Sequence, residues 1–268
     1  MELISNVKNI SYEKEVTESE MVCEHCGKPY KQVKISFIMD GLKHNPKIFN
    51  EPVCRCIEII KEKEKEKREQ ERLEKLKNER LQELFTNSLI TPYFKMKTFE
   101  RIEQNYNTEQ AIKYVRDFIP FYSNGIQMIG NVGTGKTTLL AAICNELLKN
   151  GYKCLFTTFS ELLSRFTSHS SNNAGSITDL LNWLIEFDFV CLDDIGREAY
   201  TDKRKEIAFQ IIDTLLNYRV VVAFTANPEM IEKLKQIPEM NAALDRLREM
   251  CPIKYEFRGK SLRGRNIL

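Results

Sequence analysis

The sequence predicts an α/β protein in which a parallel sheet carries helices on both faces, preceded by a small domain and a charged helical linker. Short apolar segments alternate with helical segments over residues 85–268, a pattern typical of parallel sheets covered on both sides. A glycine-rich loop, GNVGTGKT, joins one of these strands to the helix after it. Four cysteines stand in two pairs well ahead of this loop.

Length and composition set the limits of this prediction. The 268 residues suit a small domain plus a medium one, and a hydrophobic content of 42% is enough for a core. No apolar run reaches the roughly 18 residues of a membrane span, and the first residues do not read as a secretory signal. We therefore expect a soluble cytoplasmic protein with no membrane partner, whose cysteines are not disulfide-bonded.

The cysteine pairs belong to residues 1–56, which we expect to form the small domain. Residues 33–40 suggest a short strand, and the few apolar residues there predict a metal staple rather than a strong core. Four thiolates match a closed tetrahedral zinc site, and the expected ligands are Cys23, Cys26, Cys54 and Cys56. His25 or His44 could replace one ligand, and free thiols or redox chemistry is the alternative.

Residues 57–84 predict a helix. Glu and Lys are good helix formers, no Gly or Pro interrupts them, and Glu64–Arg68 and Glu71–Lys75 are favourable i,i+4 pairs. Residues 61–72 contain no apolar side chain, so this half of the helix cannot bury a face and is expected to be a solvated spacer. The leucines of the second half could dock on the next domain or on a partner.

Residues 85–268 predict the α/β domain, in which strands and helices follow one another in a regular order. The expected elements are a helix over 99–119, strand 125–130, a loop and helix over 131–149, strand 153–159, helix 161–169, loop 170–176, helix 179–187, strand 189–194, helix 206–219, strand 220–227 and a helix over 244–250.

The loop at 130–137 fits the pattern G-x-x-x-x-G-K-[ST] and stands between a predicted strand and a predicted helix. Its backbone N–H groups would hold the phosphates of a nucleotide, Lys136 would reach the β- and γ-phosphates, and Thr137 would bind Mg²⁺. A structural glycine-rich turn is the disfavoured alternative. The expected nucleotide-binding residues here are Gly130, Asn131, Val132, Gly133, Thr134, Gly135, Lys136, Thr137 and Thr138.

Two later strands end in polar residues. FVCLDD (189–194) predicts Asp193 as the Mg²⁺ partner and Asp194 as the group that orients or deprotonates the attacking water. An acidic turn at a strand end is the alternative, and Asp194 is shorter than the Glu often found at this place. Asn227 could reach the γ-phosphate or cap the helix that begins at Pro228, and the two roles are compatible.

The basic residues near the end of the chain form a third group. Residues 246–268 carry seven basic side chains against two acidic ones, which indicates a phosphate-rich partner. Arg246 could act on a neighbouring subunit's nucleotide or be a solvated surface residue. Arg263 stands on a glycine-flanked loop that suits a nucleotide sensor or a disordered tail.

One internal segment, ELLSRFTSHSSNN, is the best candidate for contact with single-stranded DNA. Arg165, Phe166 and His169 there combine cations with an aromatic ring, as base stacking and phosphate binding require. The favoured alternative is an ordinary amphipathic helix that buries Leu162, Leu163 and Phe166 in the core.

Taken together, these motifs resemble the DnaC/DnaI-type replicative helicase loaders, and IstB-type transposition ATPases share the same AAA+ core. The motifs are GNVGTGKT, a strand ending DDIG, a strand ending TAN, LDRLRE and SLRG, and the likeness covers about residues 85–268. The paired cysteines followed by a helix resemble the zinc-bearing N-terminal domain of loaders from Gram-positive bacteria and their phages.

The resemblance implies an AAA+ ATPase whose subunits assemble side by side on DNA. It assigns Asp193 and Asp194 to the Walker-B pair, Asn227 to sensor 1, Arg246 to the arginine finger and Arg263 to sensor 2. It also implies that the N-terminal domain holds the hexameric replicative helicase while the ATPase domain contacts single-stranded DNA. Ala242 stands where loaders often have a further Arg, and the 41 residues after Asn227 are too few for the helical lid of many AAA+ proteins.

The leading hypothesis is therefore a helicase loader in which slow ATP hydrolysis serves as an assembly and release signal. An IstB-type ATPase that regulates a transposase is the alternative. A P-loop kinase or metabolic transferase is disfavoured, because no separate substrate pocket or lid is evident and a cysteine-bearing domain is tethered by a charged helix.

Overall fold

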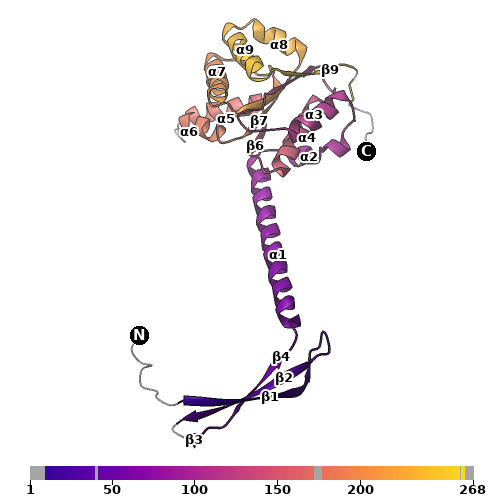
Figure 1. The fold of residues 1–268 in the computed structure, drawn as a ribbon. Coiled ribbons are helices and arrows are strands. Elements are labelled where there is room, and N and C mark those ends of the chain that lie inside the picture. The colour runs from indigo at the N-terminus through magenta and orange to yellow at the C-terminus, as the bar shows by residue number, and fades with distance from the viewer. Residues whose placement is uncertain (1–9, 40–41, 172–176, 260, 263–268) are drawn as a thin grey trace. The chain divides into compact units, whose positions relative to one another are not determined.

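The computed structural model describes residues 10–39, 42–171, 177–259 and 261–262 of the chain (Figure 1). It separates into two compact units, Met1–Leu76 and Lys77–Leu268. The long helix α1, Cys56–Asn87, begins in the first unit and ends in the second.

The first unit is an antiparallel sheet with very little core. Strand β1 (Ile10–Val22) and strand β4 (Lys47–Pro52) pair with opposite edges of β2 (Pro29–Met39), and β3 (Leu42–Lys43) pairs with the end of β2. The predicted strand at 33–40 falls largely within β2, whereas the sequence did not predict β1, β3 or β4. Among the described residues of this unit, Cys23 and Val33 are the buried hydrophobic ones.

Helix α1 contains the predicted helix 57–84 and extends it at both ends. The predicted pair Glu64–Arg68 forms, with 3.5 Å between its charged atoms, but both side chains are more than half exposed. Such exposed pairs contribute only about 0.2–1 kcal/mol each. Leu84 is buried and joins the core of the second unit, as expected for the second half of this helix.

The second unit is built on a five-stranded sheet in the order β6-β7-β8-β5-β9, and every neighbouring pair is parallel. The strands are β5 (Ile126–Gly130), β6 (Cys154–Thr158), β7 (Phe189–Ile195), β8 (Val221–Ala226) and β9 (Ile253–Phe257). The helices are α2 (Pro92–Lys95), α3 (Tyr106–Arg116), α4 (Lys136–Lys149), α5 (Phe159–Ser171), α6 (Ile177–Leu184), α7 (Asp202–Asn217), α8 (Pro228–Lys235) and α9 (Pro238–Met250).

Two hydrophobic cores cover the two faces of this sheet. Successive side chains of a strand point to opposite faces, so Val190 and Leu192 enter one core while Phe189 and Cys191 enter the other. The first core holds residues of α5 to α9, and the second holds residues of α3, α4 and the end of α1. The predicted α/β fold with helices on both faces is therefore confirmed.

One prediction about the elements of this unit was wrong. The single helix expected over 99–119 is a short 3₁₀ turn, Phe99–Arg101, followed by α3. The side chain of Asn105 accepts a hydrogen bond from the backbone N–H of Thr108 at 3.1 Å and so caps a new helix. Strand β9 was not predicted, and residues 172–176 of the expected loop lie outside the described residues.

Candidate functional site

The predicted phosphate-binding loop connects β5 to α4, at the carboxyl end of β5. Gly133 and Gly135 have φ angles of 79° and 96°, in the left-handed region that glycine tolerates best. Gly135 is also the N-cap residue of α4, so the loop leads directly into the amino terminus of a helix. Backbone N–H groups and the helix dipole together favour an anion at this place.

Lys136 is the first residue of α4 and is almost fully buried. Its Nζ donates to the backbone oxygens of Gly130 and Asn131 at 2.7 Å each, and to Oδ1 of Asn227 at 3.0 Å. Asn227 is the N-cap residue of α8, yet its side chain makes no capping hydrogen bond. Its amide oxygen instead faces the lysine, so strands β5 and β8 bring these two predicted residues together.

Asp193 lies beside Thr137, as expected of a shared Mg²⁺ site. Its Oδ1 accepts hydrogen bonds from Oγ1 of Thr137 at 2.9 Å and from Oγ1 of Thr225 at 2.6 Å. Burial raises the pKa of the Asp193 carboxyl, and the two hydroxyl groups offset part of this effect. Because carboxylate and hydroxyl oxygens are hard ligands that suit Mg²⁺, the residues present fit that ion.

Asp194 occupies an irregular position at the end of β7. The register between β7 and β8 shifts between Leu192 and Ile195, which places one extra residue on β7. Asp194 has a φ angle of 60°, unusual for a residue with a side chain. Its backbone N–H donates to Oγ1 of Thr225 at 2.8 Å, and its Oδ2 lies 2.7 Å from Nη1 of Arg197. Such bulges often re-aim side chains next to active sites.

These groups border a cavity of about 530 Å³, within the usual size of ligand pockets. One wall is the phosphate-binding loop with Asp193 and Asp194, and the other comes from the segment between Tyr93 and Thr108. Leu262 closes a further side, where its backbone N–H donates to the oxygen of Gly133 at 2.8 Å. The C-terminal segment thus reaches the loop at Leu262. Arg263, the next residue, lies outside the described residues.

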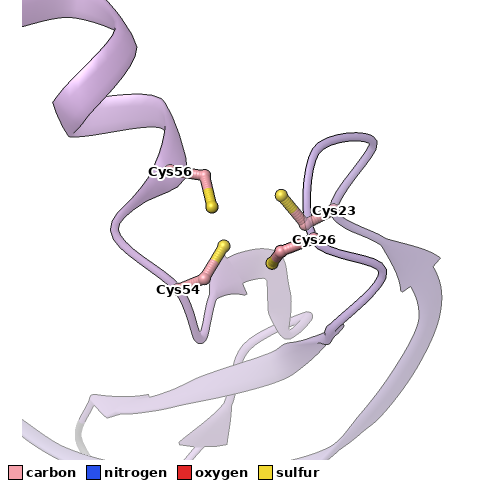
Figure 2. Close-up of side chains that lie close together, drawn as sticks. All are labelled: Cys23, Cys26, Cys54 and Cys56. Carbon is pink, nitrogen blue, oxygen red and sulfur yellow. The ribbon is translucent and has the colours of Figure 1, made fainter.

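The first unit contains a separate cluster of four cysteines (Figure 2). The sulfur atoms of Cys23, Cys26, Cys54 and Cys56 point toward one another and all lie within 4.8 Å of one another. Tetrahedral zinc with Zn–S bonds of about 2.3 Å needs sulfur atoms about 3.8 Å apart, so the cluster fits the ion. No histidine joins it in the part of the chain that the structure describes.

The turn that carries the first cysteine pair favours the thiolate form of Cys23. Gly27, with a φ angle of 68°, donates its N–H to the oxygen of Cys23 at 2.8 Å and closes the turn. The backbone N–H groups of His25 and Cys26 lower the pKa of the Cys23 thiol to about 6. Because thiolates are the metal-binding form, this backbone geometry favours a metal centre.

Comparison with known proteins identifies the family. A model of IstB-like ATP binding proteins matches residues 53–268. The chain belongs to the IstB-like ATP-binding family. It is 30% identical to the replicative helicase loader DnaC of Escherichia coli (strain K12) over 194 residues, which are 69% of this chain and 77% of that protein.

Two further comparisons agree with the predicted resemblance, which is confirmed. The replicative helicase loader DnaI of Bacillus subtilis (strain 168) is 27% identical over 129 residues, 46% of this chain and 40% of that protein. A crystal structure of the DnaC helicase loader superposes with a TM-score of 0.55 at 20% identity, covering 63% of this chain and 100% of that one. This structural likeness concerns the fold, which is the predicted AAA+ α/β fold.

In this IstB-like chain the predicted arginine finger contacts helix α7 of the same chain. Nη2 of Arg246, on α9, lies 3.4 Å from Oδ1 of Asp213. The guanidinium also lies 4.1 Å from the centre of the Phe209 ring. Asp213 and Phe209 both belong to α7. One terminal nitrogen, Nη1, is buried without a hydrogen-bond partner. Arg246 does not border the cavity of its own chain. The arrangement is compatible with action on a neighbouring subunit, which stays a prediction.

The internal segment considered for DNA contact is a core helix, as the favoured alternative predicted. Phe166 is fully buried with Leu162 and Leu163, so its ring is not available for stacking on a base. Arg165 lies over the ring of Trp183 at 5.6 Å. The side chain of His169 lies outside the described residues.

The sequence did not single out Thr225 or Arg197. Thr225 is a fully buried hydroxyl that links Asp193 to the backbone of Asp194. A polar residue within an apolar strand was the available signal, because buried hydroxyls need partners. Arg197 carried no signal, since only the folded loop places it against Asp194. The described part of the chain contains no helix long and apolar enough to cross a membrane.

Proposed function

We propose that this protein is an ATP-dependent loader of the hexameric replicative DNA helicase onto single-stranded DNA during replication initiation. The observation that carries the proposal is its 30% identity to a replicative helicase loader over 194 residues, 69% of this chain. The alternative is an IstB-type ATPase that regulates a transposase, which the family match supports equally for the ATPase unit. The separate cysteine-bearing unit favours the loader.

The nucleotide site supports a mechanism for ATP hydrolysis. The loop N–H groups and Lys136 would hold the phosphates, and Thr137 and Asp193 are the residues that would hold Mg²⁺. When bound, the ion would neutralise charge on the phosphates. Asp194 orients the attacking water and accepts its proton as the bond between the γ-phosphorus and the leaving ADP oxygen breaks. Asn227 accepts a hydrogen bond from Lys136, and through this lysine it would respond to whether a γ-phosphate is bound.

Association of several copies of this chain would add a residue from a neighbouring copy to the nucleotide site. We propose that the ATPase units lie side by side on single-stranded DNA, with Arg246 acting on the neighbour's γ-phosphate and Arg263 on the nucleotide of its own subunit. Hydrolysis is slow and is stimulated by DNA or by the helicase. The ATPase units then assemble on DNA when the γ-phosphate is present, and they are released after it is lost.

Replacing Arg246 with Ala is expected to abolish the stimulation of ATP hydrolysis by single-stranded DNA while ATP binding stays intact, because a trans-acting finger touches only a neighbour's nucleotide. Fingers of this kind contribute about 10³–10⁵ in rate where measured. Hydrolysis with and without DNA and ATP affinity are the measurements. Arg248→Ala, on the same helix and paired with Asp245, is the control. Loss of ATP binding in the Arg246 variant would contradict the finger role.

We further propose that residues 1–56, with zinc bound by the four cysteines, hold the helicase, and that residues 57–84 are the spacer to the ATPase domain of residues 85–268. The sheet offers a suitable surface. Tyr12 lies opposite Phe37, and Val16 and Phe49 lie on either side of Val33, so these side chains share one face. Tyr12 and Phe49 are 66% and 47% exposed, and exposed apolar patches of this kind are typical of protein-binding surfaces.

A pull-down with residues 1–84 tests the proposal directly. This fragment is expected to retain the hexameric helicase, whereas residues 85–268 alone should not. In the full chain, a Tyr12→Ser/Phe49→Ser variant should weaken helicase binding by about tenfold or more, since each truncated hot-spot residue costs about 1–2 kcal/mol. Ile48→Ser removes an equally exposed apolar residue from the opposite face and serves as the control. Capture of a transposase instead of the helicase would favour the alternative function.

A further inference from the structure

The ion pair between Asp194 and Arg197 is the feature of the site that the proposed mechanism does not use. Its atoms, Oδ2 of Asp194 and Nη1 of Arg197, lie 2.7 Å apart. Asp194 borders the nucleotide cavity, while Arg197 does not. The arginine therefore contacts the proposed water-orienting carboxylate from outside the cavity.

We propose that Arg197 restrains Asp194 and keeps basal ATP hydrolysis slow, by occupying the carboxylate oxygen that would otherwise receive the attacking water's proton. This inference rests on the proposed function of Asp194. A general base must lie within hydrogen-bond reach of the proton it abstracts. Because the guanidinium lies 2.7 Å from Oδ2, water must compete with an ion pair for that oxygen.

The backbone on both sides of the ion pair is held firmly, so the pair does not form by chance in a loose loop. Asp194 has a left-handed φ angle of 60°, and its N–H is bound to Thr225. Gly196 has a φ angle of 99°, and a Cβ added there would lie 2.7 Å from the Cβ of Met230 on α8. The loop thus packs against α8 at a position that only glycine fills.

Glu198 fixes the other side of Arg197. It is 8% exposed, and its Oε2 accepts hydrogen bonds from the N–H of Gly196 at 2.9 Å and from the hydroxyl of Tyr200 at 2.6 Å. The carboxylate of Glu198 therefore links Gly196, on one side of Arg197, to Tyr200 on the other side. These hydrogen bonds fix the backbone conformation of the loop, so the side chain of Arg197 can reach the carboxylate of Asp194.

The ion pair can open without unfolding the loop. The side chain of Arg197 is 52% exposed and that of Asp194 is 29% exposed. A partly exposed pair is worth roughly 0.2–1 kcal/mol and weakens as salt screens it. The restraint is therefore small enough to be removed by a change in conformation or by a competing anion.

The rate of ATP cleavage in Arg197→Gln tests the restraint. We expect the single-turnover rate of the full chain to rise about two- to fivefold, the size of one partly exposed ion pair, with ATP affinity unchanged. Arg197→Lys keeps the charge and should stay close to the wild type. Wild-type hydrolysis should also rise as salt increases from about 0.05 M to about 0.3 M, where screening is strong, whereas Arg197→Gln should respond less.

The control is Arg219→Gln, an exposed arginine between α7 and β8 that forms no ion pair with another described residue. It should leave both the rate and its salt dependence unchanged. A rate in Arg197→Gln equal to or below that of the wild type, at unchanged ATP affinity, would overturn the restraint and make Arg197 a bystander or an aid to Asp194.

A second pair of variants separates this inference from the proposed function. Asp194→Asn should abolish hydrolysis in both the wild-type and the Arg197→Gln background. If Asp194→Asn hydrolyses ATP at the wild-type rate, the assignment of Asp194 fails, and the restraint fails with it. If Asp194→Asn is inactive but Arg197→Gln is not faster, the restraint alone fails.

Discussion

Replacing Lys136 with Ala is expected to remove ATP hydrolysis almost completely and to weaken ATP binding strongly. The lysine is the only side-chain cation of the phosphate-binding loop, and it is nearly buried. A charge in such a poorly solvated site interacts far more strongly with phosphate oxygens than it would in water. Losing one preorganised group that stabilises developing charge costs about 10²–10³ in rate, and loss of binding adds to this.

The contacts of Lys136 make this effect larger than that of a simple phosphate contact. Its Nζ joins the oxygens of Gly130 and Asn131 in β5 and the loop to Asn227 beyond β8. In Lys136→Ala the loop and Asn227 lose their common partner, so the response to the γ-phosphate is lost as well. We expect an unchanged overall fold, because the neighbouring core of α4 does not depend on this side chain.

The measurements are ATP affinity by calorimetry and hydrolysis by phosphate release. Lys149→Ala is the matched control, because it removes a lysine from the other end of α4 that is paired with Glu146 at 3.0 Å. Hydrolysis at a wild-type rate in Lys136→Ala would show that the cavity between the loop and residues 93–108 is not the ATP site.

The elements that were predictable from the sequence are those whose signal is local. Strands β5, β7 and β8 are apolar runs buried on both sides, and the loop before α4 carries its own motif. Strand β1 was missed because its side chains are largely exposed, and a solvated edge strand with several Glu residues lacks the apolar pattern of a core strand. The helix over 99–119 was predicted too long because the capping role of Asn105 went unrecognised.

The chemistry of the site was predictable only in part for a related reason. Asp193, Thr137, Lys136 and Asn227 were expected around one bound nucleotide, because the loop motif and the polar ends of two later strands can be read from the sequence. The ion pair of Arg197 and the hydrogen bonds of Thr225 depend on a strand bulge and a loop conformation, which no local pattern specifies. In the same way, only the folded chain places Asp213 and Phe209 against Arg246.

Removing zinc is expected to unfold the first unit and leave the ATPase unit intact. Among its described residues the first unit buries only Cys23 and Val33 as core hydrophobics, so its sheet has almost no hydrophobic core to stabilise it. Structural zinc supplies about 10–16 kcal/mol of binding free energy, which in such a unit is folding free energy. The second unit has two extensive cores and does not contain the cluster.

The purified chain should therefore contain one zinc per molecule, measured by elemental analysis. A strong chelator, or Cys54→Ser, should abolish the β-sheet signal of the first unit and helicase binding, while ATP affinity stays unchanged. His25→Ala is the control, since this exposed neighbour of Cys26 is not part of the cluster and its loss should leave zinc in place. Loss of zinc in His25→Ala would show that a histidine is a ligand. If the first unit stays folded in the presence of chelator, zinc bound by the four cysteines does not stabilise this sheet.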